Sequence, residues 1–363
     1  MIIKSIELSD FRNYDSLSMR FDKDTNILYG DNAQGKTNIL EAIYLCSTTK
    51  SHKGSKDKEL IKLDRKESHI RMVVEKNQIN HTVDMHLKKN KTKGIAIDGI
   101  PIRKSSELIG LVNVVFFSPE DLSIIKNGPA ERRRFIDMEL CQLDKIYLYN
   151  LTKYNKILNQ RNNLLKQIPH NRSLMDTLSI WDEQLITYGN SIIVRRKAFI
   201  DELNEMIGLI HNRLSGGREQ LSVHYDPSIE CEFFAKKLEQ SIEKDILLKM
   251  TGIGPHRDDI SFMIKNVDIR KFGSQGQQRT AALSLKLAEI EILRQTVKEE
   301  PILLLDDVLS ELDRSRQNYL LESIENIQTI VTCTGLEEFV NNRLKINKIY
   351  KVVDGTVTAE SEK

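Results

Sequence analysis

The chain has 363 residues, 40% of them hydrophobic and 29% charged, which is enough for one large or two ordinary folded cores. Because the net charge is only +2, binding of nucleic acid has to rest on local basic clusters. The opening segment, MIIKSIELSDF, has acidic residues and no sustained apolar run, which argues against a secretory signal or a membrane span and predicts a cytoplasmic protein with no membrane partner.

In chain order, the first part of the sequence alternates strands with one helix. Residues 2–8 and 26–29 are predicted strands, and a glycine-rich turn separates the second one from apolar residues at helical spacing between 39 and 44. Short β-rich runs follow from about 68 to 117, with a hairpin signal at Asp98-Gly99. The pattern predicts strand, loop and helix, and then a β-meander.

The middle of the sequence is rich in charged helix formers, with Leu and Ile at three- and four-residue spacing from about 129 to 213. One interruption predicts two long antiparallel helices ending at Gly216-Gly217. At about 1.5 Å per residue, such helices could project roughly 50–60 Å. We therefore expect an α/β head in two parts, 1–128 and 217–363, interrupted by a helical arm at 129–216.

The strongest motif is an eight-residue segment between a predicted strand and a predicted helix, which fits the phosphate-loop pattern GxxxxGK[ST]. Its residues are Gly30, Asp31, Asn32, Ala33, Gln34, Gly35, Lys36 and Thr37. In such loops backbone N–H groups face phosphate oxygens, while Lys36 would reach the β- and γ-phosphates and Thr37 would bind Mg²⁺. The motif predicts ATP and Mg²⁺ as cofactors, and the alternative is a fortuitous glycine-rich turn.

A phosphate site also needs a carboxylate to hold the metal. The apolar run 302–305 ends in Asp306 and Asp307, which places two carboxylates at the C-terminal edge of a buried strand. Asp306 is the predicted Mg²⁺ residue, directly or through water. Asp307 occupies the position at which ABC-type ATPases usually have a glutamate that polarises the attacking water, so we expect slow hydrolysis. The alternative is that the two acids cap a turn or helix.

Two Ser-Gly segments compete for the signature that contacts the γ-phosphate bound to a second head in ABC-type ATPases. The segment at Ser215 resembles LSGGQ, but a strand-like run follows it and Asp306 lies about 90 residues further on. After Ser274 and Gly276 comes a long helix-forming run, and Asp306 follows after about 30 residues. We therefore assign the contact to Ser274 and Gly276 at a helix N-terminus, and the Ser215 segment to a helix end.

Two later segments also bear on ATP turnover. The run from Ser310 to Asp313 resembles the loop that crosses between heads in these ATPases, although it also fits a capped helix start. Thr334 stands where ABC transporters have a switch histidine, which again predicts slow turnover.

Three basic clusters are candidates for DNA binding, and each by itself could be only a solvated face. They are Lys88, Lys89, Lys91 and Lys93; Arg132, Arg133 and Arg134; and Arg195, Arg196 and Lys197. Contacts from these clusters would go to the DNA backbone, without reading bases.

Five further stretches in the same order make the sequence resemble the RecF family from residue 1 to about 355. They are Phe11-Arg12-Asn13-Tyr14, Ser51-His52-Lys53, Phe117 to Leu122, Arg132 to Asp137, and Gly254 to Asp259. The resemblance implies an ABC/SMC-like ATPase head that binds ATP and DNA and forms an ATP-dependent homodimer. It also implies work with RecO and RecR in DNA repair and replication, so that RecA is loaded at single-strand gaps.

By their positions in this resemblance, Arg12 and either His52 or Lys53 would approach the nucleotide, and Glu120 would lie in a loop that senses the γ-phosphate. A surface salt bridge is the alternative for Arg12. His256 is expected to be a core or turn histidine, because no cluster of His and Cys has metal-ligand spacing.

Other functions fit parts of the same pattern. The soluble ATPase subunit of a transporter would share the nucleotide motifs, but the missing switch histidine and the helical insertion argue against it. A nuclease of the related ATP-dependent kind would need an acid-rich metal domain, for which the chain has no room. A structural clamp that binds ATP without hydrolysing it is the third alternative to the expected weak, DNA-stimulated ATPase.

Overall fold

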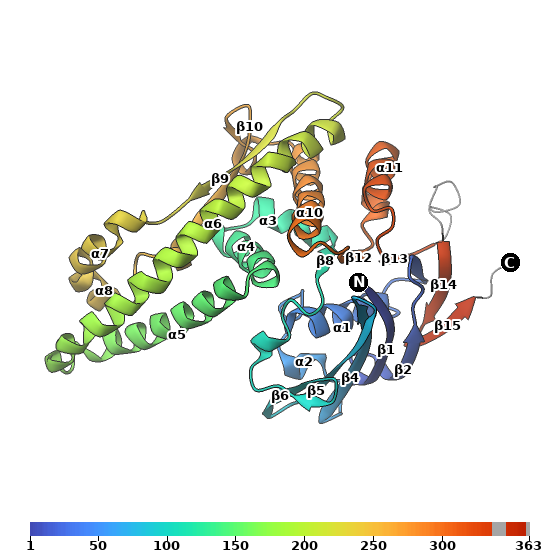
Figure 1. The fold of residues 1–363 in the computed structure, drawn as a ribbon, viewed down its shortest axis with the longest axis horizontal. Coiled ribbons are helices and arrows are strands. Elements are labelled where there is room, and N and C mark those ends of the chain that lie inside the picture. Colours follow the sequence, from blue (N-terminus) through green and yellow to red (C-terminus); the bar gives the residue numbers. More distant parts are fainter. Residues whose placement is uncertain (336–345, 361–363) are drawn as a thin grey trace. The chain divides into compact units, whose positions relative to one another are not determined.

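The computed structural model describes residues 1–335 and 346–360, which divide into two compact units. Unit 1 comprises Met1–Asp121 and Glu289–Lys363, and unit 2 comprises Leu122–Ala288 (Figure 1). The arm expected at 129–216 lies inside unit 2. Residues 217–288, which the sequence assigned to the head, belong to unit 2 by their contacts.

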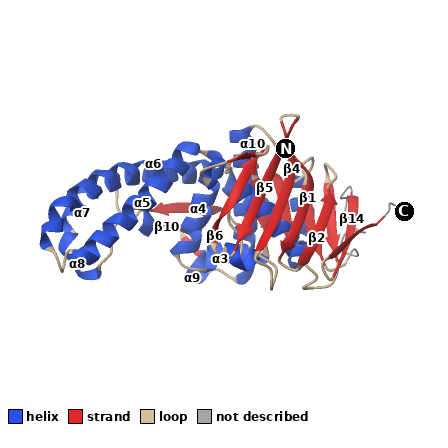
Figure 2. Ribbon diagram, turned by 90° about the horizontal axis from the view of Figure 1, so that it is seen from below, coloured by secondary structure: helices blue, strands red, loops and turns tan. Residues whose placement is uncertain are grey.

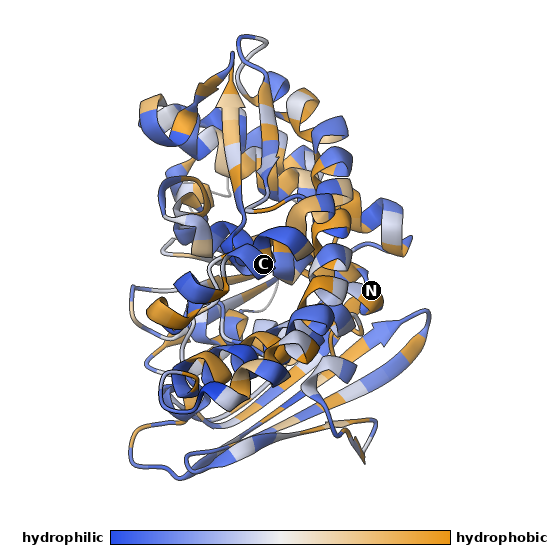
Figure 3. Cartoon of the chain, turned by 90° about the vertical axis from the view of Figure 1, so that its left-hand side faces the viewer, coloured by the Kyte–Doolittle hydropathy of each residue, from blue (hydrophilic) through white to orange (hydrophobic). Residues whose placement is uncertain are grey.

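Unit 1 contains two six-stranded sheets, and helix α1 (Lys36–Thr48) contacts strands of both. The first sheet is antiparallel and has the order β2-β1-β4-β5-β6-β7 (Figure 2). Its strands are β1 (Ile2–Phe11), β2 (Tyr14–Arg20), β4 (Glu67–Lys76), β5 (Ile79–Lys88), β6 (Lys91–Ile97) and β7 (Ile100–Pro101). Hydrophobic and hydrophilic residues alternate along its strands (Figure 3), because one face covers the core.

The second sheet of unit 1 has the order β15-β14-β3-β13-β12-β8 and is parallel except for the pair β14 and β15. Its strands are β3 (Thr25–Tyr29), β8 (Val114–Phe117), β12 (Ile302–Asp306), β13 (Thr329–Cys333), β14 (Ile346–Val353) and β15 (Thr356–Glu360). The unit also contains the short helices α2 (Asp57–Leu60) and α11 (Arg314–Ser323) and the last part of α10 (Gln275–Val297). Strand β12 is buried along its whole length, as its continuous apolar run predicts.

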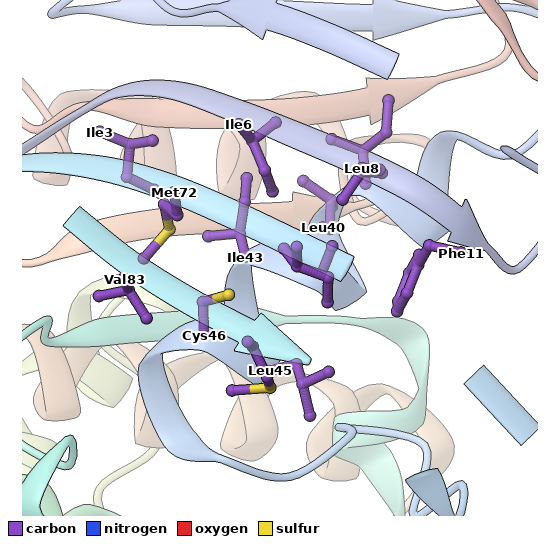
Figure 4. Close-up of a cluster of buried hydrophobic side chains, with 14 of the residues drawn as sticks. Ile3, Ile6, Leu8, Phe11, Leu40, Ile43, Leu45, Cys46, Met72 and Val83 are labelled. Atoms are coloured by element: carbon purple, nitrogen blue, oxygen red, sulfur yellow. The ribbon is translucent and has the colours of Figure 1, made fainter. Parts of the chain in front are cut away.

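The core of unit 1 lies around α1, which is buried on nearly all sides. Figure 4 shows Leu40 and Ile43 of this helix among side chains of the first sheet, including Ile6 and Met72, all fully buried. Burying a side chain of this size stabilises the fold by about 1.5–3 kcal/mol. The helix that begins at the end of the phosphate loop is therefore fixed firmly in place.

Unit 2 combines a set of helices with a three-stranded sheet of order β11-β10-β9. Its helices are α3 (Leu122–Lys126), α4 (Pro129–Leu143), α5 (Lys145–Gln167), α6 (Leu178–Leu214), α7 (Cys231–Gln240), α8 (Ile242–Leu248), α9 (Ile269–Phe272) and the first part of α10 (Gln275–Val297). Its strands are β9 (Leu221–Asp226), β10 (Asp259–Ile264) and β11 (Val267–Asp268). Helices α5 and α6 pack side by side (Figure 1).

The prediction of two long helices in the arm is wrong in its first half. A break at Asp144 divides that half into α4 and α5, because the Asp144 carboxylate caps α5 by accepting from the backbone N–H groups of Ile146 and Tyr147. Helix α6, of 37 residues, matches the second half and is about 56 Å long at 1.5 Å per residue.

The predicted strands at 2–8 and 26–29, the helix after the phosphate loop and the hairpin at Asp98-Gly99 are confirmed by β1, β3, α1 and the β6–β7 pair. Both turn residues of that hairpin have positive φ, 52° and 77°, as a two-residue hairpin turn requires. Among the described residues, no helix is both long enough and apolar enough to cross a membrane.

Candidate active site

The phosphate loop connects β3 to α1 in a backbone conformation that depends on glycine. Gly30 and Gly35 have φ of 151° and 112°, which L side chains rarely adopt. A Cβ atom at Gly30 would lie 2.3 Å from the carbonyl oxygen of Val352, and one at Gly35 would lie 2.5 Å from Asn13 Nδ2. Gly30 and Gly35 are therefore closely surrounded by other parts of unit 1, while residues 31–33 between them are exposed.

Lys36, the first residue of α1, is buried with only 4% of its surface exposed. Its Nζ donates to the carbonyl oxygens of Gly30 (2.7 Å) and Asp31 (2.9 Å), so the ammonium group lies over its own loop. These are neutral acceptors. The charge of Lys36 is thus available to an anion bound in the loop.

Thr37 and Asp306 are 269 residues apart in sequence, and the fold brings them together. The Thr37 hydroxyl donates to Asp306 Oδ1 at 2.8 Å, and the Thr332 hydroxyl donates to the same oxygen at 2.7 Å. Parallel pairing of β12 with β13 aligns Asp306 with Thr332. The hydroxyl and carboxylate oxygens fit Mg²⁺, which prefers oxygen ligands and commonly takes only one or two of them from the protein.

Thr332 is a site residue that the sequence analysis missed. Its signal was a hydroxyl in the middle of a buried apolar strand, and the pairing partner of that strand could not be known from the sequence. Thr332 Oγ1 also accepts from the backbone N–H of Asp307 at 3.0 Å. It therefore contacts both acids that follow the apolar run.

Asp307 has an unusual backbone conformation for a residue with a side chain, with φ of 52°. Such positions occur mostly where the surrounding structure enforces them, and often at functional sites. Burial raises the pKa of the Asp307 carboxyl, while the charge of Lys36 opposes this rise and that of Asp306 adds to it. A raised pKa suits a proton acceptor better than an ordinary surface aspartate.

In this structure Arg12 forms an ion pair with Glu41, and a salt bridge was the alternative to its predicted nucleotide contact. Its guanidinium group donates to both carboxylate oxygens of Glu41 at 2.8 and 2.9 Å, and also to Ser55 Oγ and the Glu59 carbonyl. Glu41 is fully buried on α1 and also accepts from Ser51 Oγ. Burial alone would raise the pKa of Glu41, but the hydrogen bonds from Arg12 and Ser51 lower it.

Ser274, the residue before α10, forms a reciprocal pair of hydrogen bonds with Gln277. Its hydroxyl accepts from the backbone N–H of Gln277 at 3.2 Å, and its own N–H donates to Gln277 Oε1 at 2.8 Å. Ser274 and Gly276 are both exposed, so this helix N-terminus is accessible to an anion. Gln277 is held in turn by Glu219, to which its Nε2 donates at 2.8 Å.

The Ser215 segment ends a helix, as the sequence predicted. Helix α6 stops at Leu214, and Gly216 and Gly217 follow with φ of 65° and 79°. Their N–H groups donate to the carbonyl oxygens of Arg213 and Asn212. Carbonyl groups rather than N–H groups are presented at this end, which does not favour phosphate.

The capped-start alternative for 310–313 also agrees with the structure. Asp313 Oδ1 accepts from the backbone N–H of Arg316 at the start of α11, while Ser310 Oγ donates to the Asp307 carbonyl at 2.8 Å. Thr334 lies after β13 with an exposed side chain. Ser310 is thus joined to the second acid of the site.

Comparison with known proteins identifies the family. A family model described as the RecF/RecN/SMC N terminal domain matches residues 2–358. A protein of Lachnoclostridium phytofermentans named DNA replication and repair protein RecF is 67% identical over 357 residues, covering 98% of this chain and 99% of that protein. A protein of the same name from Lachnospira eligens is 62% identical over 363 residues, covering 99% and 100%. The chain belongs to the RecF family.

A solved structure of the RecF family agrees with the fold. It is described as the recombination mediator protein RecF-ATP in the RecFOR pathway, is 36% identical, and has a TM-score of 0.93, covering 99% of this chain and 98% of that chain. The predicted fold class, an α/β ABC/SMC-like ATPase head with an inserted antiparallel helical arm, is therefore confirmed.

Two of the stretches that resemble RecF meet in a buried ion-pair network of unit 2. Arg132 donates to both carboxylate oxygens of Asp259 at 2.6 and 3.0 Å. Arg196, also buried, donates to Asp258 at 2.9 Å and to Asp137 at 2.8 Å. Because these two arginines are enclosed and paired with acids, they are wrong candidates for DNA contacts.

His256, in the same network region, is a satisfied histidine, as expected. Its Nδ1 lies 2.7 Å from the Tyr154 hydroxyl and its Nε2 lies 3.0 Å from the Thr251 carbonyl oxygen. Burial lowers the pKa of His256 to about 4, so the ring is neutral near pH 7. His52 of unit 1 stacks on Phe116 with ring centroids 4.2 Å apart, and burial lowers its pKa to about 4 as well.

Proposed function

We propose that the chain is an ATP-dependent, DNA-binding recombination mediator of DNA repair and replication, acting in the cytoplasm, which dimerises on ATP and assists RecA loading at single-strand gaps. The observation that carries the proposal is the hydrogen bond between Thr37 and Asp306, which joins the phosphate loop to the carboxylate strand. The name and ATP-bound state of the similar solved structure support it. RecR and RecO are the proposed partners.

In this proposal the phosphate loop binds the triphosphate of ATP. Lys36 exchanges its two carbonyl acceptors for the β- and γ-phosphates, which carry charge and form stronger hydrogen bonds. Thr37 and Asp306 would hold Mg²⁺, which would supply positive charge beside the phosphates. Arg12 remains a candidate for a nucleotide contact only if it leaves Glu41.

Hydrolysis is proposed to be slow. Asp307 has a shorter side chain than the glutamate usual at this position, and Thr334 replaces the switch histidine. We expect Asp307→Glu to raise the rate of phosphate release with ATP and DNA present, and Asp307→Asn to lower it. A chain that releases no phosphate under any of these conditions would be the non-hydrolysing clamp.

Dimerisation is proposed to follow from a shared triphosphate. Lys36 of one copy and Ser274 of the second copy would hold the same γ-phosphate, since Ser274 and Gly276 form an exposed helix N-terminus. Nucleotide would then shift the equilibrium toward the dimer, because it binds the associated state more tightly.

Light scattering with and without ATP and Mg²⁺ tests this role. Ser274→Arg should leave ATP binding to the monomer intact and abolish the increase in mass on adding ATP. Ser191→Arg, which adds the same charge at an exposed position on α6, is the matched control and should dimerise like the parent chain. Dimerisation of Ser274→Arg would refute the shared triphosphate.

DNA binding is proposed to use the exposed members of the basic clusters. These are Lys89, Lys91, Arg134 and Lys197. Contacts from such residues go to phosphates, so affinity should fall steeply between about 50 and 200 mM salt and depend little on base sequence. Affinity that does not change over this range would contradict backbone recognition.

A further inference from the structure

The end of the phosphate loop next to α1 is held by hydrogen bonds from two distant parts of unit 1. The Gln34 carbonyl oxygen accepts from Asn13 Nδ2 at 3.0 Å and from the backbone N–H of Gly355 at 3.2 Å. The Gly35 carbonyl oxygen accepts from the Tyr14 hydroxyl at 3.0 Å and, in the first turn of α1, from the backbone N–H of Asn38 at 3.0 Å. None of these donors belongs to the phosphate-loop pattern.

Fixing these two carbonyl groups also fixes two N–H groups. The peptide bonds of the described residues are trans, and in a trans peptide the C=O of one residue and the N–H of the next point in opposite directions. Because the carbonyls of Gln34 and Gly35 face these donors, the N–H groups of Gly35 and Lys36 face the opposite way. Successive N–H groups of this kind form an anion-binding nest.

Asn13 and Tyr14 are well suited to this task. Tyr14 is fully buried, and burial raises the pKa of its phenol, so it stays protonated and can only be a donor to Gly35. The Asn13 amide is oriented by a second hydrogen bond, in which its Oδ1 accepts from Asn38 Nδ2 at 2.8 Å. The Asn13 side chain therefore joins the loop to the first turns of α1.

The turn between β14 and β15 holds the loop from the other end of the chain. Besides the Gly355 contact, the backbone N–H of Asp354 donates to Gln34 Oε1 at 2.6 Å. Asp354 and Gly355 have φ of 48° and 74°, the conformation of a two-residue hairpin turn. A Cβ atom at Gly355 would lie 3.0 Å from the Asn13 carbonyl oxygen, so the turn, Asn13 and the loop are in close contact.

We propose that Asn13, Tyr14 and the Asp354-Gly355 turn are positioning residues that hold the phosphate loop ready for a triphosphate without touching the nucleotide. The inference rests on the proposed binding of ATP at this loop. When a donor is removed, the loop adopts other conformations, and affinity falls in proportion to the fraction that stays competent.

Tyr14→Phe is the most conservative test, because it removes one hydroxyl and keeps the ring. We expect ATP and inorganic triphosphate to bind about three- to tenfold more weakly, because the Gly35 carbonyl keeps its hydrogen bond from the Asn38 N–H and loses only the one from Tyr14, and a single hydrogen bond is worth roughly half to one decade in a binding constant. Tyr154→Phe removes a comparable buried hydroxyl from unit 2 and should leave both affinities within about twofold. Equal affinities in Tyr14→Phe and the parent chain would overturn the proposal.

The Gly355 turn has a natural matched control in the β6–β7 turn. Gly99 also follows an aspartate, has φ of 77°, and has no atom within 4 Å of a Cβ placed on it. Alanine would strain the backbone similarly at both positions, because both have positive φ. Only in Gly355→Ala would the added Cβ atom lie close to Asn13. We expect Gly355→Ala to weaken triphosphate binding at least about threefold and Gly99→Ala to leave it unchanged. Equal effects of the two variants would mean that the turn does not position the loop.

Lys36→Ala separates failure of this inference from failure of the proposed function. If the parent chain does not bind ATP, or binds it no better than Lys36→Ala, ATP binding at this loop is wrong. If the parent chain binds ATP and Tyr14→Phe binds it equally well, only the positioning role is wrong. A loss for ATP without a loss for inorganic triphosphate would also contradict the positioning role, because the nest contacts phosphate alone.

Discussion

The stretches that resemble RecF do different things in the two units. In unit 1, the 11–14 stretch lies against the 30–37 loop, and its Asn13 and Tyr14 bind the loop backbone. In unit 2, the 132–137 and 254–259 stretches meet in buried ion pairs. Motifs that are equally conspicuous in the sequence thus contact the phosphate loop in one unit and form buried ion pairs in the other. Substitutions in each unit should separate these two roles.

The largest effect is expected in the ion-pair network of unit 2. Arg196→Met leaves Asp137 and Asp258 without their buried partner and should lower the free energy of unfolding by about 3–5 kcal/mol. Arg195→Met, at the preceding position, breaks only partly exposed ion pairs and should lower the free energy of unfolding by at most about 1 kcal/mol. Urea unfolding followed by fluorescence of Trp181, the only tryptophan, measures both. If Arg196→Met lowered ATP affinity together with stability, the ion pairs of unit 2 would also contribute to ATP binding, and the two units would not have separate roles.

The second effect concerns the phosphate loop of unit 1. Lys36→Ala should weaken ATP binding by about 100-fold, because charged hydrogen bonds to phosphate are worth about 1.5–3 kcal/mol, and should change stability little. Lys23→Ala removes an exposed lysine from the same unit and is the control. Calorimetric titration with ATP gives the affinities. A Lys36→Ala chain that binds ATP normally would place the ligand elsewhere.

The third effect is a pH dependence that the two units share. His52 in unit 1 and His256 in unit 2 have pKa values lowered from 6.5 to about 4 by burial. Above pH 6.5 both imidazole rings are neutral in the folded and in the unfolded protein. Between pH 6.5 and pH 4 the rings take up a proton only in the unfolded protein, so the free energy of unfolding decreases as the pH falls. At pH 5 each histidine should account for about 2 kcal/mol.

Hydrogen exchange at pH 7 and pH 5 assigns this loss to each unit. His256→Gln should reduce the extra exchange at pH 5 in unit 2, and His52→Gln should do so in unit 1. His170→Gln, at an exposed position, is the control. If neither His52→Gln nor His256→Gln changes the pH dependence, the two histidines have the same pKa in the folded and the unfolded protein, which would contradict the effect of burial.

The smallest effect is expected at the start of α10. Gln277→Met removes the reciprocal hydrogen bond to the Ser274 N–H and should cost about 0.5–1 kcal/mol in the same urea assay. Binding of ATP to the monomer should not change. A change in monomer affinity would mean that this turn contributes to the nucleotide site within one chain.

The fold class and the order of the nucleotide motifs could be predicted from the sequence because each motif is local. The GxxxxGK[ST] loop, the apolar strand before Asp306 and the helix after Ser274 each carry their signal within about 25 residues. The run that follows each Ser-Gly segment and its distance from Asp306 separated the two segments, and the structure agrees that Ser215 ends a helix.

What the sequence could not give are the contacts between distant segments. The roles of Thr332 and the Asp354-Gly355 turn depend on which strands pair with β3 and β12, and pairing is not encoded in any short pattern. The prediction that Arg132 and Arg196 contact DNA failed for a related reason. Neighbours on a helix point in different directions, so Arg196 is buried while Lys197 is exposed.

Crosslinking tests the shared triphosphate most directly. One chain would carry Asn32→Cys in the exposed part of the phosphate loop and a second, differently tagged chain would carry Ser274→Cys, with the four native cysteines replaced. The account predicts a mixed disulfide dimer that forms with ATP and Mg²⁺, and none when Ser191→Cys replaces Ser274→Cys. Absence of the mixed dimer with ATP, while ATP still raises the mass of the parent chain, would contradict a phosphate held by both copies.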